Sequence, residues 1–139
     1  MIALDTDIMT LALYGDAAIT ARLDAVPIIE QGVPIVVVEE LVRGRLAAIR
    51  QAESGKGKNN LADAYDLFTK TVKDTRKYEL LRFTPPAEQL VVSWKRLKLK
   101  IGSKDLRIAA ISIIHGAKLV TRNARDYAQV PGLNFEVWN

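Results

Sequence analysis

The chain has 139 residues, a length that predicts a single domain over residues 1–139. It contains no cysteine and one histidine, His115, which excludes disulfide frameworks, thiol nucleophiles and cysteine-ligated or histidine-rich metal centres. Twenty Lys and Arg against sixteen Asp and Glu give a formal charge of +4, a modest preference for polyanionic partners. Apolar stretches are far shorter than the roughly 20 residues that span a bilayer. Asp5 and Asp7 also interrupt the place of an export signal, so we expect a soluble, cytoplasmic protein.

The first forty residues predict two buried strands separated by a helix. The apolar run 2–4 ends abruptly at Asp5, as a short buried strand does. Helical spacing relates Ile19, Leu23 and Val26, and Gly32 closes the predicted helix. The continuous β-branched run 34–38 predicts a second strand that is covered on both faces and leads into Glu39 and Glu40.

The rest of the chain predicts helices that alternate with three more strands. Amphipathic helices flank a polar, glycine-rich loop at 54–60, which we expect to form a mobile hairpin; the helix after it carries the apolar stripe Leu61, Ala64, Tyr65, Phe68 and Val72. Short strands are predicted at 80–83, 118–121 and 135–138, with helices opened by Thr84, Ser103 and Asn123. This alternation indicates an α/β fold, a three-layer sandwich with a mainly parallel sheet of four or five strands flanked by helices.

Acidic residues follow the predicted strands or begin the helices after them. In open α/β sheets, ligands bind at the carboxyl ends of the strands, so acids from distant parts of the chain can meet there. These acids are Asp5, Glu39, Glu40, Asp105 and Asp126. Two carboxylates ~4 Å apart repel by about 4 kcal/mol at an effective dielectric constant near 20. We therefore expect them to share Mg²⁺ or Mn²⁺, which would activate a water and neutralise charge on a phosphodiester.

Four segments carry a family resemblance in their order along the chain. They are Leu4-Asp5-Thr6-Asp7, Glu40-Leu41-Val42-Arg43-Gly44, Asp105-Leu106-Arg107-Ile108-Ala109-Ala110, and Leu119 to Tyr127 followed by Val130-Pro131-Gly132-Leu133. Together they resemble the PIN-domain ribonucleases, and in particular the VapC-type toxins of prokaryotic toxin–antitoxin pairs. The resemblance implies a PIN-like fold and an endoribonuclease that depends on Mg²⁺ or Mn²⁺. It also implies a homodimer and a cognate antitoxin that holds the enzyme inactive.

Position by position, the resemblance gives Asp5, Glu40 and Asp105 as the catalytic, metal-binding acids. Either Asn123 or the catalytic candidate Asp126 completes the site, directly or through water. Thr6 and Thr121 can support the carboxylates through hydroxyl hydrogen bonds, and Asp7 adds a negative charge where the family commonly has asparagine. Glu39 and Glu40 are neighbours that point in different directions, so we expect one of them to face the metal.

A run of cations lies beside the predicted acidic site, between Lys95 and Arg107. Such a run can be simply a solvated face, but a basic rim beside a metal centre also suits an RNA nuclease, because phosphate contacts hold the strand. We predict RNA contacts from Arg43, Lys98, Lys100, Lys104 and Arg107, with Lys56 and Lys58 extending the rim.

Other interpretations of the same residues stay open at this point. Asp5 and Asp105 could stabilise helix N-termini, Glu40 could be solvated, and Asp126 could be a surface charge. A signalling receiver domain would share the length and winding, although it needs a lysine after a late strand, where this chain has Thr121-Arg122-Asn123. A catalytically inactive RNA-binding module of the same fold is the third candidate.

Overall fold

The computed structural model describes residues 1–56 and 60–139, and its centre is a fully parallel, five-stranded sheet. The strands are β1 (Ile2–Leu4), β2 (Gln31–Pro34), β3 (Glu79–Leu81), β4 (Lys118–Thr121) and β5 (Phe135–Val137). Their order across the sheet is β3-β2-β1-β4-β5. The α/β prediction is therefore confirmed. A receiver-like sheet has the order 2-1-3-4-5, so the strand order excludes that alternative.

Strand β1 lies in the middle of the sheet, and both of its neighbours run parallel to it. Ile2 pairs with Gln31 of β2 on one side and with Lys118 of β4 on the other. Ala3 and Leu4 are fully buried, because helices cover both faces of a parallel sheet. The residue that follows β1 is consequently held at the centre of the carboxyl edge.

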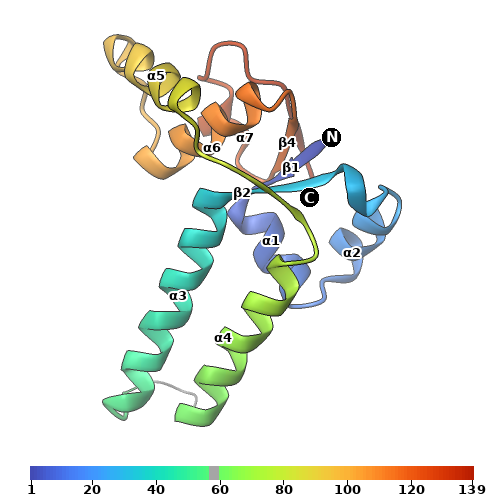
Figure 1. The fold of residues 1–139 in the computed structure, drawn as a ribbon, viewed down its shortest axis with the longest axis vertical. Coiled ribbons are helices and arrows are strands. Elements are labelled where there is room, and N and C mark those ends of the chain that lie inside the picture. The colour runs from blue at the N-terminus through green and yellow to red at the C-terminus, as the bar shows by residue number, and fades with distance from the viewer. Residues whose placement is uncertain (57–59) are drawn as a thin grey trace.

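Seven α-helices connect these strands within the described residues (Figure 1). They are α1 (Thr6–Leu13), α2 (Ala17–Asp24), α3 (Ile35–Glu53), α4 (Leu61–Thr75), α5 (Pro85–Trp94), α6 (Ser103–Ile114) and α7 (Ala124–Tyr127), with 3-10 turns η1 (Ile28–Glu30) and η2 (Lys95–Leu97). Helices α3 and α4 lie side by side and project from the sheet as a hairpin, while α5 packs on α6. Within the described ranges, no helix has both the length and the apolar sequence that crossing a membrane requires.

The predicted strand at 34–38 is wrong. Strand β2 ends at Pro34, and the β-branched run that follows forms the first turn of α3. Val36 and Val37 are buried there, and this tertiary packing outweighs the small helical cost of β-branched residues, a few tenths of a kcal/mol each. Glu39 and Glu40 therefore lie in the second turn of a helix, one turn beyond the edge of the sheet.

Three smaller expectations also differ from the structure. The helix before β2 ends at Asp24, and Gly32 is inside β2, where a Cβ would lie 2.9 Å from the Leu81 side chain of β3. Glycine is needed there because the neighbouring side chain covers its Cα. Helix α6 is preceded by Gly102, without a side-chain cap from Ser103. The predicted apolar stripe of α4 is largely exposed at Leu61, Tyr65 and Val72.

Several local expectations are confirmed. Strand β4 spans 118–121 as predicted, and β5 is an edge strand. Thr84 caps α5, its hydroxyl accepting a hydrogen bond from the Ala87 backbone N–H, and Asn123 caps α7. The central part of the predicted loop at 54–60, including Lys58, lies outside the described residues.

Candidate active site

Asp5 leaves the end of β1 and caps the N-terminus of α1. Its backbone N–H donates to the carbonyl of Val120 in β4 at 3.1 Å, which fixes the chain at this point. The carboxylate accepts hydrogen bonds from the Thr6 backbone N–H at 2.8 Å and from the Thr121 hydroxyl at 2.6 Å. The side chain is 5% exposed, so its orientation is set by the sheet on both sides.

Burial raises the pKa of Asp5 to about 7 from 3.8, because the ionised form loses its hydration. The negative charges of Asp7 and Asp105 raise this pKa further, while the hydrogen bonds from Thr121 and Thr6 lower it. A bound cation would offset the negative charge of the neighbouring acids and so favour the ionised form of Asp5.

Asp105 approaches Asp5 from the first turn of α6, and one hydroxyl group contacts both. The phenolic oxygen of Tyr127 lies 3.2 Å from Oδ1 of Asp5 and 3.3 Å from Oδ1 of Asp105. Burial, followed by the charges of Glu40, Asp126 and Asp7, raises the pKa of Asp105, whereas the Tyr127 hydrogen bond lowers it. Tyr127 is fully buried, and burial together with the two carboxylates raises the pKa of its hydroxyl, which stays protonated.

Glu40 faces the same site, whereas Glu39 faces away from it. Oε1 of Glu40 accepts a 2.6 Å hydrogen bond from the Thr6 hydroxyl, although 34 positions separate the two residues. Glu39 instead forms ion pairs with Lys104 at 2.5 Å and with Arg43 at 3.1 Å. The Lys104 hydrogen bond is the main reason why the pKa of Glu39 is lowered. Adjacent positions on a helix are about 100° apart, which accounts for the different directions.

These side chains line one open cavity of about 490 Å³, which we call the acid cavity. It is lined by Asp5, Thr6, Asp7, Thr10, Leu11, Glu40, Asp105, Arg122 and Asn123. Asp7 is held at its rim, where its carboxylate accepts from the backbone N–H groups of Ile8 at 2.7 Å and Arg122 at 3.1 Å. The structure thus brings together three of the four predicted catalytic acids and three of the four predicted supporting residues. The fourth supporting residue, Thr121, does not line the cavity but donates a hydrogen bond to Asp5.

Asp126, the fourth predicted catalytic acid, lies behind Asn123. The Asn123 side-chain amide donates to Oδ2 of Asp126 at 3.0 Å, and its oxygen accepts from the Asp126 backbone N–H at 3.4 Å. Asp126 lines a different cavity together with Lys100, Arg125 and Gln129. Its charge still reaches the site, since it contributes to the raised pKa of Asp105.

The oxygen donors of the acid cavity have the chemistry that hard divalent cations prefer. In their present orientations, however, no three acidic or histidine side chains of the described ranges are grouped closely enough to hold an ion. Asp5 and Asp105 are joined through Tyr127, and Glu40 is hydrogen-bonded to Thr6. A cation would therefore replace the contacts that Glu40 and Asp105 make now.

Comparison with solved structures identifies the fold. The chain superposes over its full length on a chain of VapBC2 from Rickettsia felis, crystallised with a DNA fragment from their promoter, with a TM-score of 0.76 and 23% identity over 100% of both chains. For DNA-bound VapBC from Salmonella typhimurium, the TM-score is 0.79 and the sequence identity is 19%, again over 100% of each chain. For FitAcB from Neisseria gonorrhoeae, the TM-score is 0.79 and the sequence identity is 19%, over 98% of this chain and 97% of the FitAcB chain.

The fold is PIN-like. The predicted resemblance is thereby confirmed at the level of the fold, over 98% or more of this chain, to chains of VapBC and FitAB structures. No protein-family model and no curated protein sequence matches the chain. All these identities are below 25%, so the comparison identifies the architecture, and the chemistry of the acid cavity depends on this chain's own residues.

In this PIN-like fold the predicted RNA-binding residues fall into two groups beside the acid cavity. Arg43 and Lys104 converge on Glu39, and Arg107 lines a cavity that also includes Glu39. Lys100 belongs to the cavity of Asp126. Lys98 is exposed in the segment before Lys100, with a left-handed backbone (φ 49°). The predicted RNA contacts of these residues stay a prediction.

Tyr127 and Arg122 take part in the acid cavity, although the sequence analysis predicts no role for them. Tyr127 belongs to a recognised segment, but no spacing rule indicates that its hydroxyl reaches Asp5, 122 positions away. Arg122 lines the acid cavity, and its position directly after β4 was the available signal.

Proposed function

We propose that this chain is an endoribonuclease that depends on Mg²⁺ or Mn²⁺ and acts as the toxin of a toxin–antitoxin pair. The proposal treats residues 1–139 as one nuclease domain. The observation that carries it is the meeting of Asp5, Glu40 and Asp105 in one cavity at the carboxyl edge of a parallel sheet. Solved structures with the same fold come from toxin–antitoxin complexes, which supports this choice among nucleases.

Asp5, Asp105 and Glu40 are the proposed metal ligands. When bound, the cation would activate a water molecule and neutralise charge that develops on the phosphodiester. The buried carboxylate of Asp5 supplies an oriented oxygen, because Thr6 and Thr121 fix both of its oxygens by hydrogen bonds. Asn123 shares the cavity, while Asp126 orients Asn123 and adds negative charge from behind.

The surrounding cations are proposed to hold the RNA backbone. Arg122 lines the acid cavity, and Lys104 and Arg107 project from the same helix as Asp105. Phosphate contacts of this kind position the strand without reading its sequence. RNA binding should weaken as the salt concentration rises, with a slope that reflects the number of phosphates contacted.

The proposed partners are a cognate antitoxin and a second copy of the chain, in the cytoplasm. Three of the matched structures are described as a toxin–antitoxin, VapBC or FitAB assembly. Co-expression with the product of a short adjacent reading frame should give a stable complex without nuclease activity. Light scattering on the isolated chain should give twice its mass of 15.4 kDa.

Cleavage of structured RNA tests the proposed activity. Purified protein should cut in the presence of Mn²⁺ and lose activity with a chelator. Asp5→Asn and Asp105→Asn should each lower the rate by at least about 100-fold, because loss even of a residue that only orients a metal ligand costs about 10- to 100-fold. The matched control is Asp66→Asn, which removes an exposed carboxylate of α4 outside the acid cavity. It should cleave like the unmodified chain.

Undiminished cleavage by both acid variants would remove the proposed mechanism. Calorimetric titration with Mn²⁺ separates the remaining alternative. A chain that binds RNA, fails to cleave it and does not bind Mn²⁺ at the acid cavity would be an inactive RNA-binding module.

A further inference from the structure

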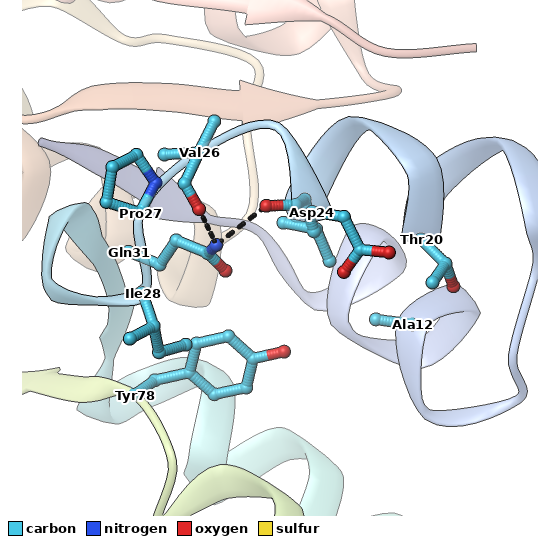
Figure 2. Close-up of a pocket in the computed structure, with 9 residues that line it drawn as sticks. Ala12, Thr20, Asp24, Val26, Pro27, Ile28, Gln31 and Tyr78 are labelled. Atoms are coloured by element: carbon cyan, nitrogen blue, oxygen red, sulfur yellow. Dashed lines mark hydrogen bonds between the residues drawn. The ribbon is translucent and has the colours of Figure 1, made fainter.

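A further cavity lies at the opposite, amino-terminal edge of the sheet. It has a volume of about 410 Å³ and is bounded by α1, α2, the first residue of β2 and the segment before β3. Its polar lining residues are Thr20, Asp24, Gln31 and Tyr78, which surround one space in Figure 2. None of them belongs to the acid cavity.

Gln31 gives this cavity a fixed hydrogen-bond acceptor. Its side chain is 4% exposed, and its Nε2 donates to the carbonyls of Leu23 at 2.9 Å and Val26 at 2.7 Å. These bonds determine which end of the amide is nitrogen. The amide oxygen points away from both carbonyls, into the space between Tyr78 and Asp24 (Figure 2), and no donor for it occurs in the described part of the chain.

The cavity is also lined by an acidic side chain, Asp24, that has no ion-pair partner among the described residues. Asp24 is the last residue of α2, where the helix dipole disfavours a carboxylate. It forms no ion pair with any residue of ranges 1–56 and 60–139, and none of the residues that line the cavity is Lys or Arg. The acid cavity, the Glu39 cavity and the Asp126 cavity each contain at least one such cation.

The negative charge of Asp24 also acts on the hydroxyl of Tyr78. Its pKa is raised mainly by burial and further by the charges of Asp74 and Asp24, against the opposing effect of Lys77. Tyr78 therefore stays neutral, and its hydroxyl can donate or accept a hydrogen bond.

The remaining walls are apolar, which restricts the kind of cation that fits. They consist of Ala12, Leu23, Val26, Pro27 and Ile28 together with the ring of Tyr78. A hydrated metal ion would gain little from such walls. A guanidinium group is weakly hydrated, stacks on aromatic rings and carries several donors in one plane, so it can reach separate acceptors at once. Its methylene stem suits the aliphatic side of the cavity.

We propose that this cavity binds a guanidinium group on an aliphatic stem. The group donates to the Asp24 carboxylate and the Gln31 amide oxygen, and its face or stem packs on Tyr78 and Ile28. The ligand is either a small guanidino compound or an arginine side chain of a polypeptide, since both present the same chemistry. The site is independent of the proposed nuclease activity.

Amide chemical shifts of the full chain, measured during titration, test the proposal. The probes are agmatine as a free guanidino compound, N-acetyl-arginine N-methylamide as an arginine within a chain, and the corresponding citrulline derivative as a neutral isostere. We expect saturable shifts at the backbone amides of Thr20, Gln31 and Tyr78 with a Kd on the order of 1 mM. Citrulline should bind at least about fivefold more weakly. The tighter of the two guanidinium probes identifies the source.

Asp24→Asn should weaken arginine binding by about fivefold, because it removes the charge and keeps the shape. Asp66→Asn is the matched control on α4 and should leave the Kd unchanged. Asp24 is exposed at a helix end, so the variant should fold, and its spectrum checks this directly. Three results would each overturn the proposal: equal affinity for citrulline and arginine, shifts confined to the acid cavity around Asp5 and Asp105, or no saturation by either guanidinium probe.

Discussion

Asp5→Asn should stabilise the chain at alkaline pH and lose this advantage in acid. The pKa of Asp5 is about 7 in the folded state and 3.8 when unperturbed, chiefly because the carboxylate is buried. A raised folded-state pKa means that the folded protein binds the proton more tightly. The resulting stability is fully present below pH 3.8 and is lost as the pH rises through 7.

The size of this effect follows from the difference in pKa. Each pKa unit corresponds to about 1.4 kcal/mol, so the three-unit difference sets an upper bound of about 4 kcal/mol between pH 4 and pH 8. Asparagine does not titrate, and its amide oxygen can still accept from the Thr6 backbone N–H. Any change in hydrogen bonding alters the unfolding free energy of the variant by the same amount at every pH. The free-energy difference between the two proteins should therefore grow by about 2–4 kcal/mol across this range.

Urea unfolding at pH 4, 5, 6, 7 and 8 in the presence of a chelator measures the difference. Contributions from groups that the substitution leaves unchanged are common to both proteins and cancel. Asp66→Asn, which removes an exposed carboxylate of α4, is measured in parallel as the control for the loss of one acidic side chain. A free-energy difference for Asp5→Asn that stays constant to within about 0.5 kcal/mol would show that folding does not raise the pKa of Asp5, which refutes the reasoning.

Three further predictions concern the same structure. Saturating Mn²⁺, at 100 times its Kd, should raise the unfolding free energy of the unmodified chain by about 2.7 kcal/mol; an equal rise in Asp5→Asn, measured by urea unfolding, would contradict metal binding at Asp5. Tyr127→Phe should weaken Mn²⁺ binding about tenfold in calorimetry, because it removes the hydroxyl shared by two carboxylates and keeps the ring; unchanged affinity would contradict this role. Gly32→Ala should lower the unfolding free energy by about 1–3 kcal/mol, because its Cβ would lie 2.9 Å from Leu81. Gly44→Ala, with nothing within 4 Å of the added Cβ, is the control and should not destabilise the chain.

Strands β1 and β4 were predictable because each is a short, mostly apolar run with polar residues directly after it. Strand β4 and the capping residues Thr84 and Asn123 are local signals, and the structure has them where the sequence places them. The run 34–38 was misassigned because a β-branched segment buried in the first turn of a helix has the same composition as a buried strand. The prediction that Glu40 reaches the site does not depend on this misassignment, because α3 begins directly where β2 ends.

The side-chain geometry of the site depends on contacts between distant residues, which no local pattern encodes. Thr6 holds Glu40 across 34 positions, and Tyr127 reaches both Asp5 and Asp105. The sequence also could not decide whether Glu39 or Glu40 faces the site, since that depends on the rotation of α3 about its axis. Glu39 turns toward Lys104, and this ion pair forms because α3 and α6 are in contact in the folded chain.

The central position of β1 has a consequence for the order in which the protein matures during translation. The first strand needs β2 on one side and β4 on the other, and the Asp5 carboxylate receives its hydrogen bonds in part from Thr121 and Tyr127. A nascent chain cannot assemble this constellation until residues 118–127 have left the ribosome. Asp5 therefore lacks two of its hydrogen-bond partners until a segment 116 to 122 positions further along the chain has been made, and until then the site is incomplete.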